Sequence, residues 1–186
     1  MHDQGAPGDL ELVRAFVNTL DMEDGREELT DPRSLRDWLE AHGLLHGDAE
    51  LGEDDLRAAL TFRECLRDLL AANNCHPLPA DTVGKLNQLV GAIRVAFRFD
   101  PDGGLDLEPC SSGVYEALGH MLAIIYAAML EGTWQRLKVC RDEGCQWAFY
   151  DHSKNRSGTW CTMQVCGSRN KARNYRSRTR AQATAR

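Results

Sequence analysis

Apolar residues in the first part of the chain recur at three- and four-residue intervals, which is the period of an α-helix with one buried face. The first such run follows Asp9, a residue type that caps helices, and predicts a helix over residues 10–22. Leu12, Phe16 and Leu20 would share its buried face. The chain is therefore expected to open with an amphipathic helix.

Four more helical segments are expected downstream, over residues 32–42, 53–74, 80–90 and 112–137. Pro32 suits the first position of its helix, and Gly43 stops the same helix. The inward face of the third helix should hold Leu56, Leu60, Leu66, Leu69 and Leu70. Residues 121–130 form the most apolar stretch, which is too short to span a membrane and predicts a buried core helix.

Between the last two of these helices the hydrophobic period changes from helical to alternating. The alternating apolar positions are Ile93, Val95, Phe97 and Phe99. A turn through residues 102–104 and a short return over 105–109 complete the pattern of a β-hairpin.

Charge divides the chain into two unlike parts. The overall net charge is −6, but residues 138–186 hold eleven Lys and Arg against three acids, whereas residues 1–137 hold eleven bases and 25 acids. Such asymmetry indicates two modules with different partners. We therefore expect an acidic helical domain over residues 1–137 and a basic domain over residues 138–186.

Four of the seven cysteines fall in the basic domain at regular spacing: Cys140, Cys145, Cys161 and Cys166. Four residues lie within each pair and fifteen between the pairs, so two tight loops can bring four thiolates to one tetrahedral Zn²⁺. We interpret the set as a structural four-cysteine zinc site without an open position. Buried unligated thiols or disulfides are the alternative.

The stretch between the cysteine pairs, residues 146–160, alternates at first and predicts a small hairpin with its turn at 155–158. Trp147, Phe149 and Trp160 are expected to pack around the metal as structural residues, because so small a knot has little other core. The expected fold class is mainly α with a small β-hairpin (α+β). A helical N-terminal domain would precede a small treble-clef-like or ribbon-like zinc finger with four cysteine ligands.

The segment after Cys166 is basic and rich in helix formers, with Ser168 in position to cap a helix. Arginines spaced by four, three and four residues would form one stripe: Arg169, Arg173, Arg176 and Arg180. Such a stripe favours phosphate contact. The candidates for nucleic-acid contact are Arg169, Lys171, Arg173, Arg176 and Arg178. Compensation of the negative zinc–thiolate centre, or a solubilising or interaction tail, are the alternatives.

The acidic domain contains no nucleophile elbow, phosphate-binding loop or dinucleotide fingerprint, so an enzyme is not expected. Asn18 and Arg63 are candidates for a small-molecule pocket, with core hydrogen bonding as the alternative. Cys65, Cys75 and Cys110 have no partner at ligand spacing. An odd cysteine count, no recognisable signal peptide and no membrane-length apolar run together predict a cytoplasmic protein.

Two motifs resemble a known family. From Trp160 the chain reads W-C-x-M-x2-C-G-S-R-x-K-A, which is similar to the CGNR zinc finger, and FVNTLD at residues 16–21 resembles the opening motif of the family's ABATE domain. Ser168 stands here at the Asn of the family name. The resemblance implies a bacterial, zinc-binding, DNA-binding transcription regulator, with the zinc ligands on the four cysteines named above.

The leading hypothesis is a regulator in two parts. The acidic helical domain would sense a small-molecule effector or form a homodimer, and the zinc finger would bind DNA. The alternatives are a zinc-stabilised RNA- or protein-interaction module, or a small-molecule-sensing protein with its ligand in the helical domain.

Overall fold

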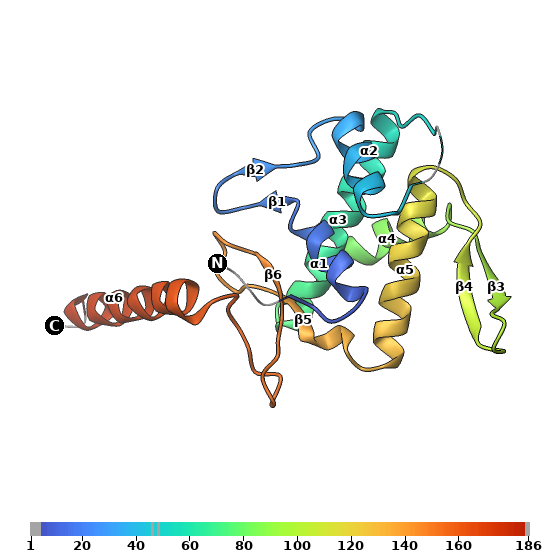
Figure 1. Ribbon diagram of the computed structural model, residues 1–186. Helices are drawn as coiled ribbons and strands as arrows, with labels where there is room; N and C mark the ends of the chain where they lie inside the picture. Colours follow the sequence, from blue (N-terminus) through green and yellow to red (C-terminus); the bar gives the residue numbers. More distant parts are fainter. Residues whose placement is uncertain (1–4, 46, 48, 185–186) are drawn as a thin grey trace.

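Helices are the main secondary structure of the chain, and three short antiparallel strand pairs accompany them (Figure 1). The computed structural model describes residues 5–45, 47 and 49–184, with side chains at all of these positions except 106, 174 and 178–184. Its α-helices are α1 (Leu10–Val17), α2 (Pro32–Ala41), α3 (Glu53–Asn73), α4 (Thr82–Val90), α5 (Val114–Leu130) and α6 (Ser168–Thr184). The strand pairs are β1 (Leu20–Asp21) with β2 (Arg26–Glu27), β3 (Val95–Phe99) with β4 (Leu105–Pro109), and β5 (Leu137–Val139) with β6 (Ala148–Tyr150). The predicted α+β class is confirmed.

The main core lies where α1, α3 and α5 pack against one another. Its fully buried side chains include Phe16, Phe62, Leu66, Leu118 and Met121. Helix α2 adds Leu35 and Leu39 from one side of α3. The helical period in the sequence therefore found the inward faces of α2 and α3, whereas in α1 only Phe16 of the three predicted residues is a buried helical residue.

Helices α2 and α3 follow the sequence predictions closely. Pro32 occupies the first turn of α2, and Asp31 and Ser34 form a reciprocal capping box, with Ser34 N–H donating to Asp31 Oδ1 over 2.7 Å. This backbone hydrogen bond lowers the pKa of the Asp31 carboxyl. Of the five predicted inward leucines of α3, Leu56, Leu66 and Leu70 are buried, whereas the remaining two are half-buried.

Helix α1 is shorter than predicted, because the chain leaves the helix after Val17. Asn18 directs its side chain to the backbone of β6, and Leu20 pairs with Glu27 in the β1–β2 ladder instead of continuing the helical face. Asp9 stands at the start of α1, but its side chain makes no capping hydrogen bond. Tertiary contacts thus override the local period at this helix end.

Helix α5 ends at Leu130, earlier than the predicted residue 137. Gly132 adopts a left-handed φ of 70°, and the Thr133 and Gly132 amides return to the carbonyls of Ala128 and Met129. This is a Schellman termination, which Gly132 signals in the sequence. A 3₁₀ turn η1 (Trp134–Arg136) then leads into β5.

The β3–β4 hairpin is confirmed, with Phe97 opposite Leu107 and a turn in which Asp100 accepts from the Gly104 amide. The second predicted hairpin is different from expectation. Strand β6 pairs with β5, which precedes Cys140, and not with residues after the turn at 155–158. The first cysteine pair therefore lies in the loop that joins the two strands of the finger.

Candidate metal centre and basic helix

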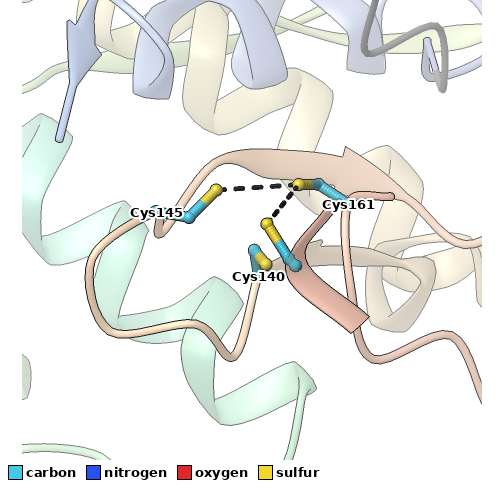
Figure 2. Close-up of side chains that lie close together, drawn as sticks. Cys140, Cys145 and Cys161 are labelled. Atoms are coloured by element: carbon cyan, nitrogen blue, oxygen red, sulfur yellow. Dashed lines mark hydrogen bonds between the residues drawn. The ribbon is translucent and has the colours of Figure 1, made fainter. Parts of the chain in front are cut away.

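Four cysteine side chains from separate parts of the C-terminal segment meet at one point. The sulfurs of Cys140, Cys145, Cys161 and Cys166 lie within 4.8 Å of one another, and all four residues are buried. The Cys161 sulfur is 3.6 Å from that of Cys145 and 3.6 Å from that of Cys166. Figure 2 shows the sulfurs of Cys140, Cys145 and Cys161 turned toward a common centre.

These separations fit a metal centre better than disulfides. Sulfurs at about 2.3 Å from a tetrahedral zinc ion lie about 3.8 Å apart, whereas a disulfide holds them at about 2.05 Å. All seven cysteines are free thiols in the structure. The four ligand positions thus match zinc, and the disulfide alternative is excluded for this arrangement.

Protonation of the cluster also favours a cation at its centre. Hydrogen bonds from Cys145 and Cys161 lower the pKa of Cys140 to about 2, so one thiolate forms readily. The interaction with Cys140 raises the pKa of Cys145 and Cys161, and burial raises that of Cys166. Four adjacent buried thiolates would repel one another. A divalent metal ion at their centre offsets this repulsion and allows all four thiols to ionise.

The backbone builds each half of the site differently. After Cys140, a turn returns the Cys145 amide to the Asp142 carbonyl over 2.8 Å, and Gln146 takes a left-handed φ of 46°. Of the second pair, Cys161 precedes a π-helical turn, η2 (Met163–Gly167), and Cys166 lies on this turn, which continues directly into α6. The turn over residues 140–146, which we call the knuckle loop, holds the first ligand pair, and the last ligand, Cys166, lies where the helix starts. This arrangement favours the treble-clef-like expectation over the ribbon-like one.

Gly167 lies where η2 meets α6, and a larger residue there would displace the Met163 side chain. A Cβ atom at this position would lie 2.5 Å from the sulfur of Met163 and 3.3 Å from Trp160 Cδ1. Ser168 does not cap the helix as predicted, because α6 continues from η2 and the Ser168 hydroxyl donates to the Met163 carbonyl over 3.3 Å.

The alternation of β6 divides its side chains between two cores. Phe149 is buried with Trp147 and Trp160 against the cysteine cluster, as predicted. Ala148 and Tyr150 point to the other side and join the main helical core together with Leu137 and Val139 of β5. The finger hairpin is therefore a shared wall between the metal centre and the helices.

A buried ion pair closes the loop beyond β6. Lys138 Nζ donates to Asp151 Oδ2 over 2.7 Å and also to the carbonyls of Arg156 and Gly158. Burial opposes ionisation of Asp151, but the hydrogen bonds from Lys138 and from the Ser153 and Gly158 amides outweigh it and lower its pKa to about 2. Sequence reading missed this pair because it gave no role to Lys138 or Asp151.

Polar side chains of the helices also bind the finger backbone, and we call this set the module junction: Asn18, Arg67, Asn73 and Asn74. Asn18 exchanges two hydrogen bonds with Ala148, at 2.9 and 2.8 Å. Arg67 donates to the Gln146 carbonyl, and Asn74 donates to the carbonyls of Val139 and Thr159. The sequence did contain a signal for this junction, because Arg67 is a charged residue on the inward stripe of α3. In the structure Arg67 is only 4% exposed.

The structure places the two candidates for a small-molecule pocket in the helical core. Asn18 belongs to the module junction. Arg63 forms a bidentate ion pair with Glu27 and also donates to Thr19 Oγ1. Hydrogen bonding to Glu27 and Glu64 raises the pKa of Arg63 against the opposing effect of burial. The protein itself thus satisfies these polar groups, and ligand binding by Asn18 and Arg63 stays a prediction.

The predicted nucleic-acid contacts lie on the first turns of α6. Arg169 forms an ion pair with Glu23 in the loop between β1 and β2, and Arg173 lies 3.3 Å from the buried Asp142 carboxylate. Lys171 and Arg176 are exposed. Arg178 is on the helical backbone, but its side chain lies outside the described ones. The sequence analysis missed both acidic partners. Glu23 is far from α6 in the sequence, and Asp142 lies buried in the loop between Cys140 and Cys145.

None of the described helices is both long and apolar enough to cross a membrane.

Comparison with known families gives two matches. The family described as "ABATE: Putative stress-induced transcription regulator" matches residues 10–132, and the CGNR zinc finger matches residues 136–179. The two occur in the order expected from the sequence motifs, and both are regulator or zinc-finger types, not enzymes. No curated protein matched the chain. The matched finger contains all four cysteines of the cluster, which supports zinc as its metal.

Proposed function

This chain belongs to the ABATE family and carries a CGNR zinc finger, and from this premise we propose that it is a zinc-dependent, DNA-binding transcription regulator. Residues 138–186 would form the DNA-binding module, and residues 1–137 the module that receives an effector. Zinc would hold the knuckle and the start of α6 in a fixed relation, and the arginines of α6 would contact phosphate.

The observation that carries this proposal is the position of α6. The helix starts at the metal centre and extends away from the rest of the molecule (Figure 1). Its first turns carry Arg169, Lys171, Arg173 and Arg176, all exposed. A projecting helix with one basic stripe can reach a phosphate backbone without rearrangement of the core.

Replacing Arg173 and Arg176 together by alanine is expected to weaken binding to duplex DNA and to lower its salt dependence. Each phosphate contact contributes about 0.9 to the slope of log affinity against log salt concentration, so the slope should fall by about 2. Fluorescence anisotropy with a labelled duplex across a salt series measures both quantities.

The matched control removes two exposed arginines from the acidic part, by Arg33→Ala and Arg57→Ala. Zinc content should be one ion per chain in the wild type and in both double variants. Absent or salt-insensitive binding by the wild-type protein would contradict the proposal. Tighter binding to single-stranded RNA than to duplex DNA in competition would favour the RNA-binding alternative.

Glu23→Gln is expected to tighten DNA binding, because Glu23 competes with phosphate for Arg169. The hydrogen bond from Arg169 to Glu23 raises the pKa of the guanidinium and ties it to the acidic β1–β2 loop. Both side chains are partly exposed, so the gain should be modest, roughly two- to fivefold at low salt, and should vanish at high salt. The same anisotropy titration measures it.

Asp24→Asn removes the same charge from the same loop, and Asp24 makes no ion pair among the described residues. An equal gain in both variants would assign the effect to general charge and not to the Glu23–Arg169 pair. A loss of affinity in Glu23→Gln would mean that Glu23 positions Arg169 for binding.

A further inference from the structure

The β3–β4 hairpin presents large apolar side chains to solvent. Phe97 is 76% exposed and Phe99 is 71% exposed, and Val95 on the same strand is half exposed. In the antiparallel register these three residues stand opposite Leu107, Leu105 and Pro109. Directly opposed residues share one face of a sheet, so the hairpin has a continuous apolar face.

A groove lies beside this face, between β4 and α5, with a volume of about 470 Å³. Its apolar lining comes from Leu105, Leu107 and Pro109 on the strand and from Ala123, Tyr126 and Leu130 on the helix. The groove also holds Arg98, Glu108 and His120, of which the first two form an ion pair. The two elements lie close together at Gly119, where a Cβ atom would lie 3.0 Å from Pro109 Cβ.

The exposed side of α5 corrects a sequence prediction. The sequence predicts a buried core helix over residues 121–130, but only one side, with Met121, Ile125 and Ala128, is buried. Leu130 is 72% exposed and Tyr126 is 53% exposed. The helix is thus apolar on two sides, and its second side forms a wall of the groove.

We propose that this hairpin face and groove form a homodimer interface, on which a second copy of this chain docks about a two-fold axis. In such an interface the same patch meets itself, so it must carry both a projecting and a receiving part. Phe97 and Phe99 project from the hairpin, and the groove beside Leu105 and Tyr126 receives aromatic rings. One patch therefore contains both halves of the contact.

The exposed area agrees with the requirement of a stable dimer. Six side chains of the patch are exposed by half or more: Val95, Phe97, Phe99, Leu105, Tyr126 and Leu130. At about 100 Å² each they present on the order of 600 Å² of apolar surface, at the upper end for the largest patch of a typical monomer. Apolar atoms make up about 65% of a homodimer interface, which gives about 900 Å² per copy, and stable complexes bury about 800 Å² on each partner.

Sedimentation velocity of the full zinc-loaded chain over a wide concentration range tests the interface. The wild-type protein should show a monomer–dimer equilibrium, and Phe97→Asp should weaken the dimer by at least about tenfold, because it places a charge in the apolar centre of the contact. Val83→Asp on α4 adds the same charge at an exposed apolar side chain outside the patch, 49% exposed, and should dimerise like the wild type.

Leu130→Lys tests the opposite wall of the groove and should weaken the dimer as Phe97→Asp does. The two walls are separate elements, so a folding defect in one variant leaves the other informative. Far-ultraviolet circular dichroism and zinc content verify that each variant is folded. A wild-type chain that stays monomeric throughout would overturn the proposal, including the case where it instead binds lipid vesicles through Phe97. A dimer insensitive to both substitutions would equally overturn it.

Discussion

Cys161→Ser is expected to abolish zinc binding and unfold the C-terminal finger. The Cys161 sulfur lies 3.6 Å from the sulfurs of both Cys145 and Cys166, and the serine hydroxyl is a poor substitute for a thiolate ligand. Structural zinc sites supply apparent free energies of about 10–16 kcal/mol, as much as a whole domain's stability of about 5–15 kcal/mol. Without the metal, Phe149 and the two tryptophans around the cluster have no other core to pack against, so the finger cannot remain folded.

The loss should extend into the helical module. Leu137, Val139, Ala148 and Tyr150 of the finger hairpin belong to the main core, so unfolding of the finger exposes part of that core. We therefore expect a lower thermal midpoint of the whole chain, in addition to the loss of near-ultraviolet signal from Trp147 and Trp160.

Metal analysis measures the loss of zinc. Near-ultraviolet circular dichroism, recorded during heating, measures the loss of tryptophan packing and the thermal midpoint. A chelator should reproduce these changes in the wild-type protein. Cys110→Ser is the matched control, because Cys110 is an exposed thiol outside the cluster. It should keep one zinc ion per chain and an unchanged spectrum. A Cys161→Ser protein that retains both would contradict the assignment of the ligands.

Lys138→Met is expected to destabilise the zinc-loaded protein by about 3–5 kcal/mol, the cost of leaving one charge of a buried pair uncompensated. Lys138 is 4% exposed and Asp151 is 2% exposed, so water cannot replace the lost ammonium group. The substitution also removes the donor to the Arg156 and Gly158 carbonyls. Urea unfolding at a constant zinc concentration measures the change in unfolding free energy.

Lys85→Met is the control for this effect. Lys85 also pairs with an aspartate, Asp81, over 2.6 Å, but both side chains are more than half exposed, so little change is expected. Pairing Lys138→Met with Asp151→Leu should recover part of the stability, because no buried charge is then left alone. Equal losses of unfolding free energy in Lys138→Met and Lys85→Met would show that the buried Lys138–Asp151 pair contributes no more to stability than the exposed pair.

The ligand set and most elements could be predicted from the sequence because they depend on neighbours in the chain. Zinc ligation needs two closely spaced cysteine pairs, and the spacing of Cys140, Cys145, Cys161 and Cys166 is visible without a structure. The inward faces of α2 and α3 follow from the 3.6-residue period, and the β3–β4 hairpin follows from alternation and a turn.

Two of the wrong predictions, the local hairpin over residues 146–160 and the length of α1, share one cause, which is competition from a distant segment. Residues 146–160 have the pattern of a local hairpin, yet β6 finds a better partner in β5, because that pairing places Ala148 and Tyr150 in the helical core. Helix α1 ends early because Asn18 is drawn to the same strand. The local sequence contains no record of either partner.

The sequence by itself determined which residues can bind zinc, which faces of the helices are apolar, and that a basic helix follows the last ligand. Only the tertiary structure decided how these parts meet: the module junction, the Lys138–Asp151 pair, the contact between Glu23 and Arg169, and the exposure of Phe97 and Phe99. Local patterns report the forces between residues a few positions apart. A buried hydrogen bond or an uncovered apolar face depends on residues that folding brings together, or leaves apart, from distant positions.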